Sequence, residues 1–370
     1  MPDFKLRPYQ TTIIESARAA MRAGSRSILL QAPTGAGKTA LSAHMLGTSS
    51  QRGVVSWFVC HRLDGTGLHQ WFNTLIEGPC VSWLIERGFL SRYRLFAPSR
   101  PDLSGVGSRM GDFIKSETSK AMDRPSITGD AVAHYKKLAS GERAMVFCSS
   151  IQHSQHVVAQ FVAAGIPAEH VDGETGPSDR DAAMRRFDRG ETLILSNVDL
   201  FGEGVDVPGA VVLIDLAPTQ SLTRCLQRWG RVLRPAPGKT EAVILDHAGN
   251  ATERHGLPDD QREWSLEGSK KRKNKDPDDV PVKQCPKCFT VVRTQVQTCR
   301  CGHVWVAAPR VVEERGGDLQ EVDPEVLRRQ RSIEQGTARS LEDLIKLGFK
   351  RGYKNPRFWA EKVYNARKRA

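Results

Sequence analysis

The chain has 370 residues, enough for about two domains and a small additional module. Its hydrophobic content of 39% and charged content of 26% are those of a globular protein, which excludes a fibrous, collagenous or wholly disordered chain. No run of about 18 apolar residues occurs, and the first residues lack the apolar core of a signal peptide, so we expect neither membrane spanning nor secretion.

The net charge of +12 is concentrated in the last third of the chain. Residues 1–267 carry 30 Lys and Arg against 29 Asp and Glu, whereas residues 268–370 carry 24 against 13. A basic block of this kind is typical of a segment that contacts polyanions, because Lys and Arg placed on phosphates release condensed counterions. A solvated tail that serves only solubility is the alternative.

The first part of the chain predicts helices and buried strands in close succession. Residues 8–22 carry apolar side chains at helical spacing after a proline. Residues 27–31 form a short apolar run that predicts a strand, and residues 39–46 predict a helix after a glycine-rich loop. Residues 54–60 predict another buried strand.

A second alternating region extends from about residue 127 to residue 250. The predicted strands, separated by helical stretches, are 144–148, 192–196, 211–216 and 242–246. Such alternation favours a parallel α/β architecture. Residues 268–282 are highly charged and almost without apolar side chains, which indicates a linker.

The loop at residues 32–39 reads Ala-Pro-Thr-Gly-Ala-Gly-Lys-Thr and connects the predicted strand to the predicted helix. This context is the one that a phosphate-binding loop requires, since backbone N–H groups and the helix N-terminus face the phosphate oxygens. Lys38 can reach the β- and γ-phosphates, and the Thr39 hydroxyl can ligate Mg²⁺. The predicted nucleotide-binding residues of the loop are Gly35, Ala36, Gly37, Lys38 and Thr39.

Further motifs occur around this loop in a recognisable order. They are Leu-Arg-Pro-Tyr-Gln at 6–10, Phe-Val-Cys-His-Arg at 58–62, Met-Val-Phe-Cys-Ser-Ser at 145–150, Val-Asp-Gly at 171–173, Asn-Val-Asp-Leu-Phe-Gly-Glu-Gly-Val-Asp-Val-Pro at 197–208 and Gln-Arg-Trp-Gly-Arg-Val-Leu-Arg at 227–234. Together with the loop, in which Ala32 replaces the usual first glycine, they resemble the DEAD/DEAH-box superfamily-two helicases, of a phage or prophage type. The resemblance covers most of residues 5–267.

The resemblance implies ATP and Mg²⁺ as cofactors and nucleic acid as the partner, DNA more than RNA. It places Gln10 and Arg7 at the adenine, Gly204 close to the nucleotide and Asp206 at a ribose hydroxyl. The residues that it assigns to the nucleic-acid backbone are His61, Arg62, Ser149 and Asn197. It also implies a cytoplasmic location, in a bacterial or phage-infected cell.

The last of these motifs supplies two arginines on one helix face. Arg231 and Arg234 are three residues apart, so both can point across an interdomain cleft at a γ-phosphate held by Lys38. By resemblance they are arginine fingers that stabilise charge in the transition state, and Gln227 orients the site. The alternative is an ordinary basic helix face with surface ion pairs.

One motif of the family is missing. Its members hydrolyse ATP with an Asp-Glu pair at a strand end in the first domain, and this sequence contains no Asp-Glu dipeptide. The Ser/Thr-Ala-Thr motif that normally follows is also missing, and the join lies near Arg62 and Leu63. About three strand-and-crossover units of roughly 30 residues each are lost. The first domain is therefore expected to be poorly cored unless a protein partner completes it.

No other acid is a good replacement for the missing pair. Glu77 and Glu86 lie near the join, but neither follows an apolar strand of the right kind. Asp215 follows an apolar run, but it lies in the second domain, so we interpret it as a strand-end residue.

Four cysteines near residue 290 have the spacing of a tetrahedral zinc site: Cys285, Cys288, Cys299 and Cys301. So short a segment has almost no core without a metal, which predicts structural zinc. The second pair is Cys-x-Cys, so His303 is an alternative ligand. The other cysteines are predicted to be buried free thiols; they are Cys60, Cys80, Cys148 and Cys225.

The tail predicts two short helices, at residues 340–347 and 355–369. Residues 344–370 hold nine Lys and Arg against a single acid, Glu361. The aromatic residues interleaved with them are Phe349, Tyr353, Phe358, Trp359 and Tyr364. This composition suits phosphate contact with base stacking, but Phe358, Trp359, Val363 and Tyr364 could equally form a small helical core.

The expected fold is therefore α/β, with two RecA-like parallel-sheet domains, the first of them truncated, followed by a zinc module and a basic helical tail. The expected boundaries are 1–95 and 127–267 for the two domains, 96–126 and 268–282 for linkers, 283–308 for the zinc-ribbon-like module and 309–370 for the tail. The leading hypothesis is an ATP-dependent helicase by descent with impaired hydrolysis. Its alternatives are a nucleic-acid-binding protein without catalysis and an internally deleted gene product.

Overall fold

The computed structural model describes residues 6–50, 68–70, 72–98, 101–109, 111–200, 209–266, 281–305 and 324–369. The chain divides into two compact units, Met1–Val306 and Ala307–Ala370. Within the described residues, no helix is both long and apolar enough to cross a membrane. The strand predicted at 54–60 lies outside the described residues.

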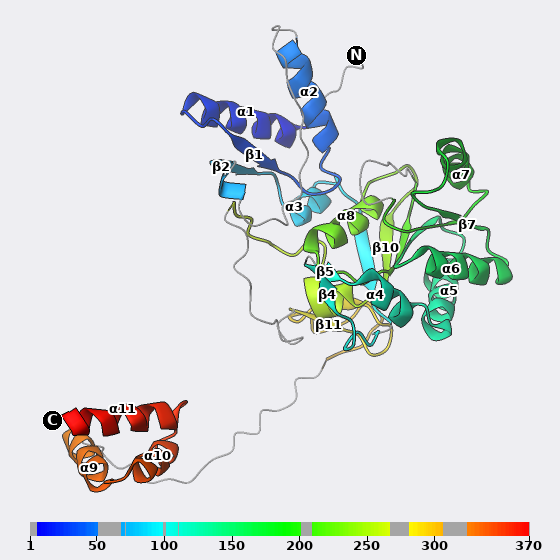
Figure 1. Ribbon diagram of the computed structural model, residues 1–370. Helices are drawn as coiled ribbons and strands as arrows, with labels where there is room; N and C mark the ends of the chain where they lie inside the picture. Colours follow the sequence, from blue (N-terminus) through cyan, green and yellow to red (C-terminus); the bar gives the residue numbers. More distant parts are fainter. Residues whose placement is uncertain are drawn as a thin grey trace. The chain divides into compact units, whose positions relative to one another are not determined.

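The first unit contains the following elements (Figure 1). Its α-helices are α1 (Pro8–Arg22), α2 (Lys38–Ser50), α3 (Val81–Glu86), α4 (Lys115–Met122), α5 (Pro125–Ala139), α6 (Ile151–Ala163), α7 (Pro177–Arg189) and α8 (Leu222–Val232). Its strands are β1 (Ile28–Gln31), β2 (Thr74–Glu77), β3 (Arg92–Phe96), β4 (Ser108–Arg109), β5 (Asp112–Phe113), β6 (Ala144–Cys148), β7 (Ala168–Val171), β8 (Ile194–Asn197), β9 (Val212–Leu216), β10 (Glu241–Asp246), β11 (Val282–Gln284) and β12 (Val291–Arg293).

A six-stranded sheet with the order β3-β10-β9-β6-β8-β7 forms the centre of this unit. Every neighbouring pair in it is parallel. Parallel neighbours need crossover connections, and α6, α7 and α8 lie in the segments between successive strands from β6 to β10. The predicted α/β class with a parallel sheet is confirmed, and β3 and β7 join the four strands that the alternation indicated.

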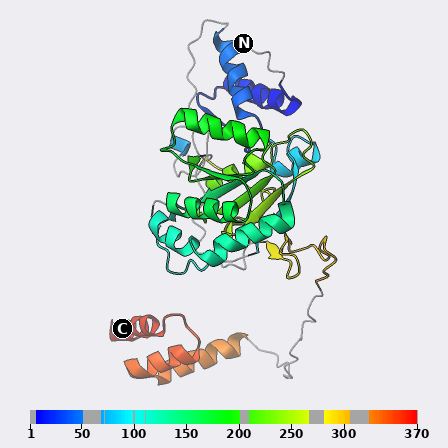
Figure 2. The same ribbon diagram turned by 90° about the vertical axis from the view of Figure 1, so that its right-hand side faces the viewer.

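Each face of this sheet is covered by helices, because its strands are apolar on both sides. On β6, Val146 belongs to the apolar cluster under α5 and α6, whereas Met145 and Phe147 belong to the cluster that contains residues of α7 and α8. Figure 2 shows α5 and α6 side by side, and the two helices pack against each other. The central sheet is thus the middle layer of three.

The first part of the chain forms a parallel pair of strands. β1 pairs with β2, and α1 packs on both. The buried apolar residues of this part include Tyr9, Ile13, Ile14, Leu41, Leu84 and Leu90. They belong to the same cluster as Trp229 of α8 and Leu233, which follows it. The first domain was predicted to be poorly cored unless a protein partner completes it, but these residues are covered within the chain because they pack continuously with the α8 face.

Residues 92–95, which the sequence analysis grouped with the first domain, are part of the central sheet. β3 pairs with β10 from Arg92 to Phe96 and forms the edge of that sheet. Its last two residues are buried and its first is exposed, as suits a strand that enters the sheet at an edge.

The cysteine-containing segment lies against this edge strand. β11 and β12 form an antiparallel hairpin. The Ala97 N–H donates to the Phe289 carbonyl at 3.0 Å, and Phe96 and Thr290 form an antiparallel bridge. Arg293 on the hairpin lies 3.0 Å from Asp259. The hairpin therefore covers the end of β3, which removes part of an otherwise unpaired sheet edge.

The second unit contains three helices, α9 (Pro324–Thr337), α10 (Leu341–Lys350) and α11 (Pro356–Arg369). Ser340 begins α10 with a capping box, in which its hydroxyl accepts from the Asp343 N–H at 3.0 Å. α10 and α11 pack closely on each other, and Gly348 allows this because a Cβ there would lie 3.0 Å from Pro356. The two predicted tail helices are therefore present.

The prediction of buried free thiols is confirmed for Cys148 and Cys225, which are fully or almost fully buried in the sheet and α8. It is wrong for Cys80, which is exposed because it stands at the surface just before α3, with its sulfur 3.1 Å from the Ser82 hydroxyl. Cys60 lies outside the described residues.

A buried histidine on α6 makes the fold sensitive to acid. His153 is fully buried, and its Nδ1 accepts from the Ser149 N–H at 3.4 Å. Burial lowers the pKa of His153 to about 4. The unfolded chain, with a histidine pKa of about 6.5, then binds more protons between pH 6.5 and pH 4, so stability falls as the pH falls through that range.

The variant His153→Asn keeps a hydrogen-bond acceptor that does not titrate. We expect its free energy of unfolding to drop from pH 7 to pH 5 by about 2 kcal/mol less than that of the wild type. Urea unfolding at both pH values measures this difference. The matched control is His44→Asn, at an exposed histidine of α2, which should follow the wild type. Equal losses in all three proteins would contradict the prediction.

Candidate nucleotide-binding and metal sites

The loop between β1 and α2 has the backbone of a phosphate-binding loop. Gly35 and Gly37 have φ values of 88° and 77°, which residues with a side chain rarely adopt. A Cβ on Gly35 would lie 2.7 Å from the Leu90 side chain, and a Cβ on Gly37 would overlap the Gln10 amide. The loop therefore needs glycine at both positions, for its own conformation and for the groups packed against it.

Lys38 stands at the first position of α2 with an exposed side chain. Its ammonium group donates to the Ala32 carbonyl at 3.0 Å. The first N–H groups of a helix lack intrahelical acceptors, and together with the helix dipole they attract an anion. Thr39, the next residue, is also exposed. Lys38 and Thr39 thus lie, with exposed side chains, at the helix N-terminus, where a phosphate group and its metal ion would bind.

Gln10 supports the loop in this structure. Its amide nitrogen donates to the Ala36 carbonyl at 3.0 Å, and its amide oxygen accepts from the Arg7 N–H at 2.9 Å. The Tyr9 hydroxyl donates to the same Ala36 carbonyl at 2.8 Å. The guanidinium of Arg7 lies over the Phe89 ring, 5.1 Å from its centroid. The segment at 6–10 therefore holds the loop, whereas its contact with adenine stays a prediction.

The phosphate loop faces α8, which carries Arg231 but ends two residues before Arg234, so the expectation that the two arginines share one helix face is corrected. A Cβ on Gly230 of α8 would lie 2.5 Å from the Thr34 side chain. The Ser91 N–H donates to the Leu233 carbonyl at 2.7 Å, and the Ser91 hydroxyl donates to the Arg234 carbonyl at 3.3 Å. Arg231 is buried on α8 and Arg234 is partly buried just after it, so both lie next to the loop that ends at Lys38, and their common role stays a prediction.

Helix α8 is held in place by a buried ion pair. Arg228 and Asp215 are both buried, and their charged groups lie 3.3 Å apart. The indole of Trp229 donates to Asp215 at 3.3 Å, and the Asn250 amide donates to it at 3.0 Å. Asp215 is thus a structural residue, as its position at a strand end suggested. Burial, together with the charge of Asp215, raises the pKa of the adjacent Asp246 to about 7.

Sequence reasoning missed two residues that position the arginine helix. Gly230 was quoted within a motif, but its contact with the phosphate loop depends on the tertiary fold. Lys239 holds the end of α8, because its ammonium group donates to the Ala210 and Arg234 carbonyls at 2.8 and 3.1 Å and also to the Val232 carbonyl. A lysine five residues beyond the last motif arginine gave no signal by itself.

Of the four residues assigned to the nucleic-acid backbone, the structure describes Ser149 and Asn197. Asn197 is fully buried and donates to the Val146 carbonyl at 2.8 Å, so in this structure its side chain joins two strands and is not exposed to a ligand. Ser149 is nearly buried, and its hydroxyl donates to the Leu216 carbonyl at 3.2 Å. Both expectations are corrected in this respect. His61, Arg62, Gly204 and Asp206 lie outside the described residues. Gln227 is partly buried on α8.

Glu77 ends β2, directly beside the end of β1. Its position next to the phosphate-loop strand makes it worth testing as an acid. It lines a groove of about 610 Å³ whose walls come from α1, Pro79, Trp83, Arg87 and Phe89 and include no residue of the 32–39 loop. Glu77 is exposed in this groove, and because it ends a strand parallel to β1, the interpretation that it follows no apolar strand of the right kind is corrected.

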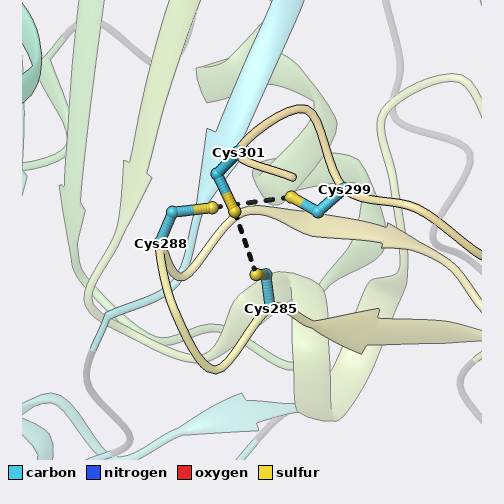
Figure 3. Close-up of side chains that lie close together, drawn as sticks. All are labelled: Cys285, Cys288, Cys299 and Cys301. Carbon is cyan, nitrogen blue, oxygen red and sulfur yellow. Dashed lines mark hydrogen bonds between the residues drawn. The ribbon is translucent and has the colours of Figure 1, made fainter. Parts of the chain in front are cut away.

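The four clustered cysteines form a possible metal site (Figure 3). Their sulfur atoms all lie within 4.8 Å of one another. Cys285 and Cys301 are separated by 3.6 Å, and Cys288 and Cys299 by 3.5 Å. Sulfurs bound 2.3 Å from a shared tetrahedral zinc lie about 3.8 Å apart, so the donor set fits that ion. Cys301, rather than His303, contributes to the cluster.

Two family models match the chain. The one described as "Helicase conserved C-terminal domain" matches residues 129–236, and the one described as "Type III restriction enzyme, res subunit" matches residues 3–75.

Two curated proteins and a solved structure are similar to the chain. A 51.5 kDa protein of a Lactococcus phage is 36% identical over 65% of this chain and 53% of its own length. The putative ATP-dependent helicase IRC3 of Saccharomyces cerevisiae is 30% identical over 45% of this chain and 24% of its own length. A fragment of a putative HsdR subunit of a type I restriction enzyme from Vibrio vulnificus has a TM-score of 0.53 at 17% identity, over 72% of this chain and 67% of that one, and shows the fold alone. The chain spans about half the length of the phage protein and about a quarter of the yeast protein.

The contact between Gly230 and Thr34 can be tested directly. We expect Gly230→Ala to destabilise the chain by about 1–3 kcal/mol, because the new methyl group overlaps Thr34 and forces the phosphate loop away from α8. Urea unfolding followed by tryptophan fluorescence measures the loss. Adding Thr34→Gly should restore most of it.

The control is Gly336→Ala, at a helical glycine of α9 with open space around its Cβ, which should be neutral or stabilising by up to about 1 kcal/mol. The steric contact would be refuted if the two alanine variants were equally stable relative to the wild type.

Proposed function

Because this chain belongs to the superfamily-two helicases, we propose that it binds ATP between the phosphate loop and α8 and binds nucleic acid, DNA in preference to RNA. The observation that carries the nucleotide site is the direct approach of the two elements, with Thr34 of the loop against Gly230 of α8. The match to a restriction-enzyme family model favours DNA.

The chain's own residues have separate roles at the nucleotide. The N–H groups of the loop and the first turn of α2 would hold phosphate oxygens, and Lys38 would leave the Ala32 carbonyl for the β- and γ-phosphates. Thr39 would ligate Mg²⁺, whose chemistry is to neutralise phosphate charge. Arg231 on α8 and Arg234 just after the helix would stabilise negative charge on the γ-phosphate.

Hydrolysis is the part of the family activity that we propose to be impaired. A water molecule needs a base or an orienting group to attack the γ-phosphate, and family members supply it from the acidic motif that this sequence lacks. Glu77, the acid at the end of β2, lines a groove whose walls include no residue of the 32–39 loop. Binding without rapid turnover is the consequence.

A second candidate function is nucleic-acid binding without catalysis. It is favoured by the continuous apolar cluster of the first part and α8, since ATP-driven translocation depends on two lobes that move relative to each other. An internal deletion in the gene would account for both the missing motif and this shared core, and it stays a prediction.

We also propose that the cysteine cluster holds one structural zinc ion. Four thiolates are the donor set of closed structural sites, which leave no position for a substrate. The hairpin that carries two of them has few buried apolar residues, which include Val291. The ion would therefore supply much of the hairpin's stability and, through Phe289 and Thr290, hold the end of β3.

Nucleotide binding without turnover is a direct prediction. The full chain should bind a fluorescent ATP analogue in the presence of Mg²⁺, and phosphate release should stay at background with or without single-stranded DNA. Lys38→Ala should abolish binding, since it removes the phosphate ligand. Lys137→Ala, at an exposed lysine of α5, is the charge-matched control and should bind normally.

DNA-stimulated turnover that Lys38→Ala abolishes would contradict the proposed impairment. If the wild type showed no binding of the analogue, the nucleotide site itself would be disproved.

The metal proposal predicts one zinc per chain by elemental analysis. Cys301→Ser should lose the metal and lower the melting temperature, and a chelator should do the same to the wild type. His303→Ala should keep the full zinc content, because the fourth member of the cluster is Cys301 and His303 lies outside it. The reverse pattern would assign the fourth ligand to His303, and zinc-free wild type would refute the site.

A further inference from the structure

The helical unit at the end of the chain has a very small interior. Among its described residues the fully buried ones are Leu344 and Ala360, and Gly348 is nearly so. A capping box begins α10, and Arg351 pairs with Glu334 of α9 at 3.0 Å. The unit is thus an ordered helical structure that leaves most of its side chains at the surface.

The aromatic residues of this unit fall into two groups. Trp359 is partly buried and lies 5.0 Å from the Tyr353 ring and 5.8 Å from the Arg351 guanidinium. Phe349 and Phe358, in contrast, are 67% and 65% exposed. The alternative of a small helical core is therefore wrong for Phe358, whereas Trp359 does contribute to packing. Two large apolar rings are exposed to water, which costs free energy that burial against a partner would recover.

The surroundings of these two rings are strongly basic. Lys350 follows Phe349, and Arg357 precedes Phe358. The exposed basic residues of α10, α11 and their connection include Lys346, Lys350, Lys354, Arg357 and Lys362. From residue 344 to the end, Glu361 is the single acid, and the acids near this surface are Glu342 and Asp343 at the start of α10 and Glu334 of α9, which lies 3.4 Å from Lys350. A neutral apolar partner would use the rings but would not explain their basic neighbours, whereas a nucleic acid uses both, since its bases stack on the rings and its phosphates pair with the charges.

We propose that α10 and α11 form a second binding surface for single-stranded nucleic acid, on which Phe349 and Phe358 stack with bases while Lys350 and Arg357 contact phosphates. Aromatic rings beside basic side chains are the means by which proteins bind single strands without strict sequence preference. This inference rests on the proposed function only in taking nucleic acid as the partner. It does not depend on the nucleotide site, because the surface lies in the separate unit after residue 306.

The test uses the full chain without nucleotide and a fluorescent oligodeoxythymidylate of about 20 nucleotides. Affinity is measured by anisotropy for a Phe349→Ala/Phe358→Ala variant. We expect a loss of about tenfold for each base that is no longer stacked. The matched control is Val326→Ala/Ile333→Ala on α9, which removes two apolar side chains that are each 60% exposed and should bind as the wild type does.

Two further measurements separate stacking from charge. Phe349→Trp/Phe358→Trp should retain the affinity, because tryptophan also stacks. Lys350→Gln/Arg357→Gln should weaken binding and lower the dependence of log K on log salt by about 0.7 for each lost phosphate contact. Photocross-linking with iododeoxyuridine should place the adduct on residues 349 or 358 of the wild type.

Undiminished affinity in the double phenylalanine variant, or adducts confined to residues 1–306, would overturn the inference while leaving nucleic-acid binding by the rest of the chain in place. Loss of binding in the Val326→Ala/Ile333→Ala control would also overturn it, since general disruption of the unit would then explain the result. Failure of ATP-analogue binding, measured separately, bears on the nucleotide site alone.

Discussion

The close approach of the phosphate loop to helix α8 is the constraint on which the rest of the first unit depends. Gly230 allows this approach because it has no side chain to meet Thr34. Ser91 adds a backbone hydrogen bond to Leu233, the residue after the helix. As a result, the short first part of the chain does not need a full sheet of its own: its apolar residues join the cluster that covers one face of the central sheet.

The same constraint links chemistry to stability. In a helicase with two independent lobes, arginines on one lobe approach the phosphates of the other when the lobes close. Here α8, which carries Arg231 and precedes Arg234, contacts the loop that ends at Lys38 through Gly230 and Thr34. The buried pair of Arg228 with Asp215 and the contacts of Lys239 fix that helix to the sheet. A nucleotide would thus enter a site whose two sides are already joined, and motion between them would disturb a common core.

The central sheet also explains the position of the cysteine hairpin. An edge strand has unpaired backbone groups, and β3 forms such an edge. The hairpin contributes Phe289 and Thr290 to the end of β3 and adds the ion pair of Arg293 with Asp259. A metal bound by the four cysteines would therefore support the sheet as well as the hairpin. The helical unit after residue 306 differs from the first unit, because few of its described residues are buried and two phenylalanines are exposed on a basic surface.

The sequence by itself predicted the candidate chemistry and determined the class of fold. The glycines and lysine of the phosphate loop, the arginines of α8, the spacing of the four cysteines and the alternation of strands and helices are local patterns, and local patterns report backbone conformation and residue type. Only the tertiary structure decided which residues these motifs contact and which of their side chains are buried. Residues 92–96 lie in the central sheet, and Asn197 is buried between strands. Cys301, and not His303, belongs to the sulfur cluster, and Phe358 is exposed whereas Trp359 is partly buried. Each of these outcomes depends on packing between residues far apart in the chain, and the spacing of residues along a sequence carries no direct measure of such packing.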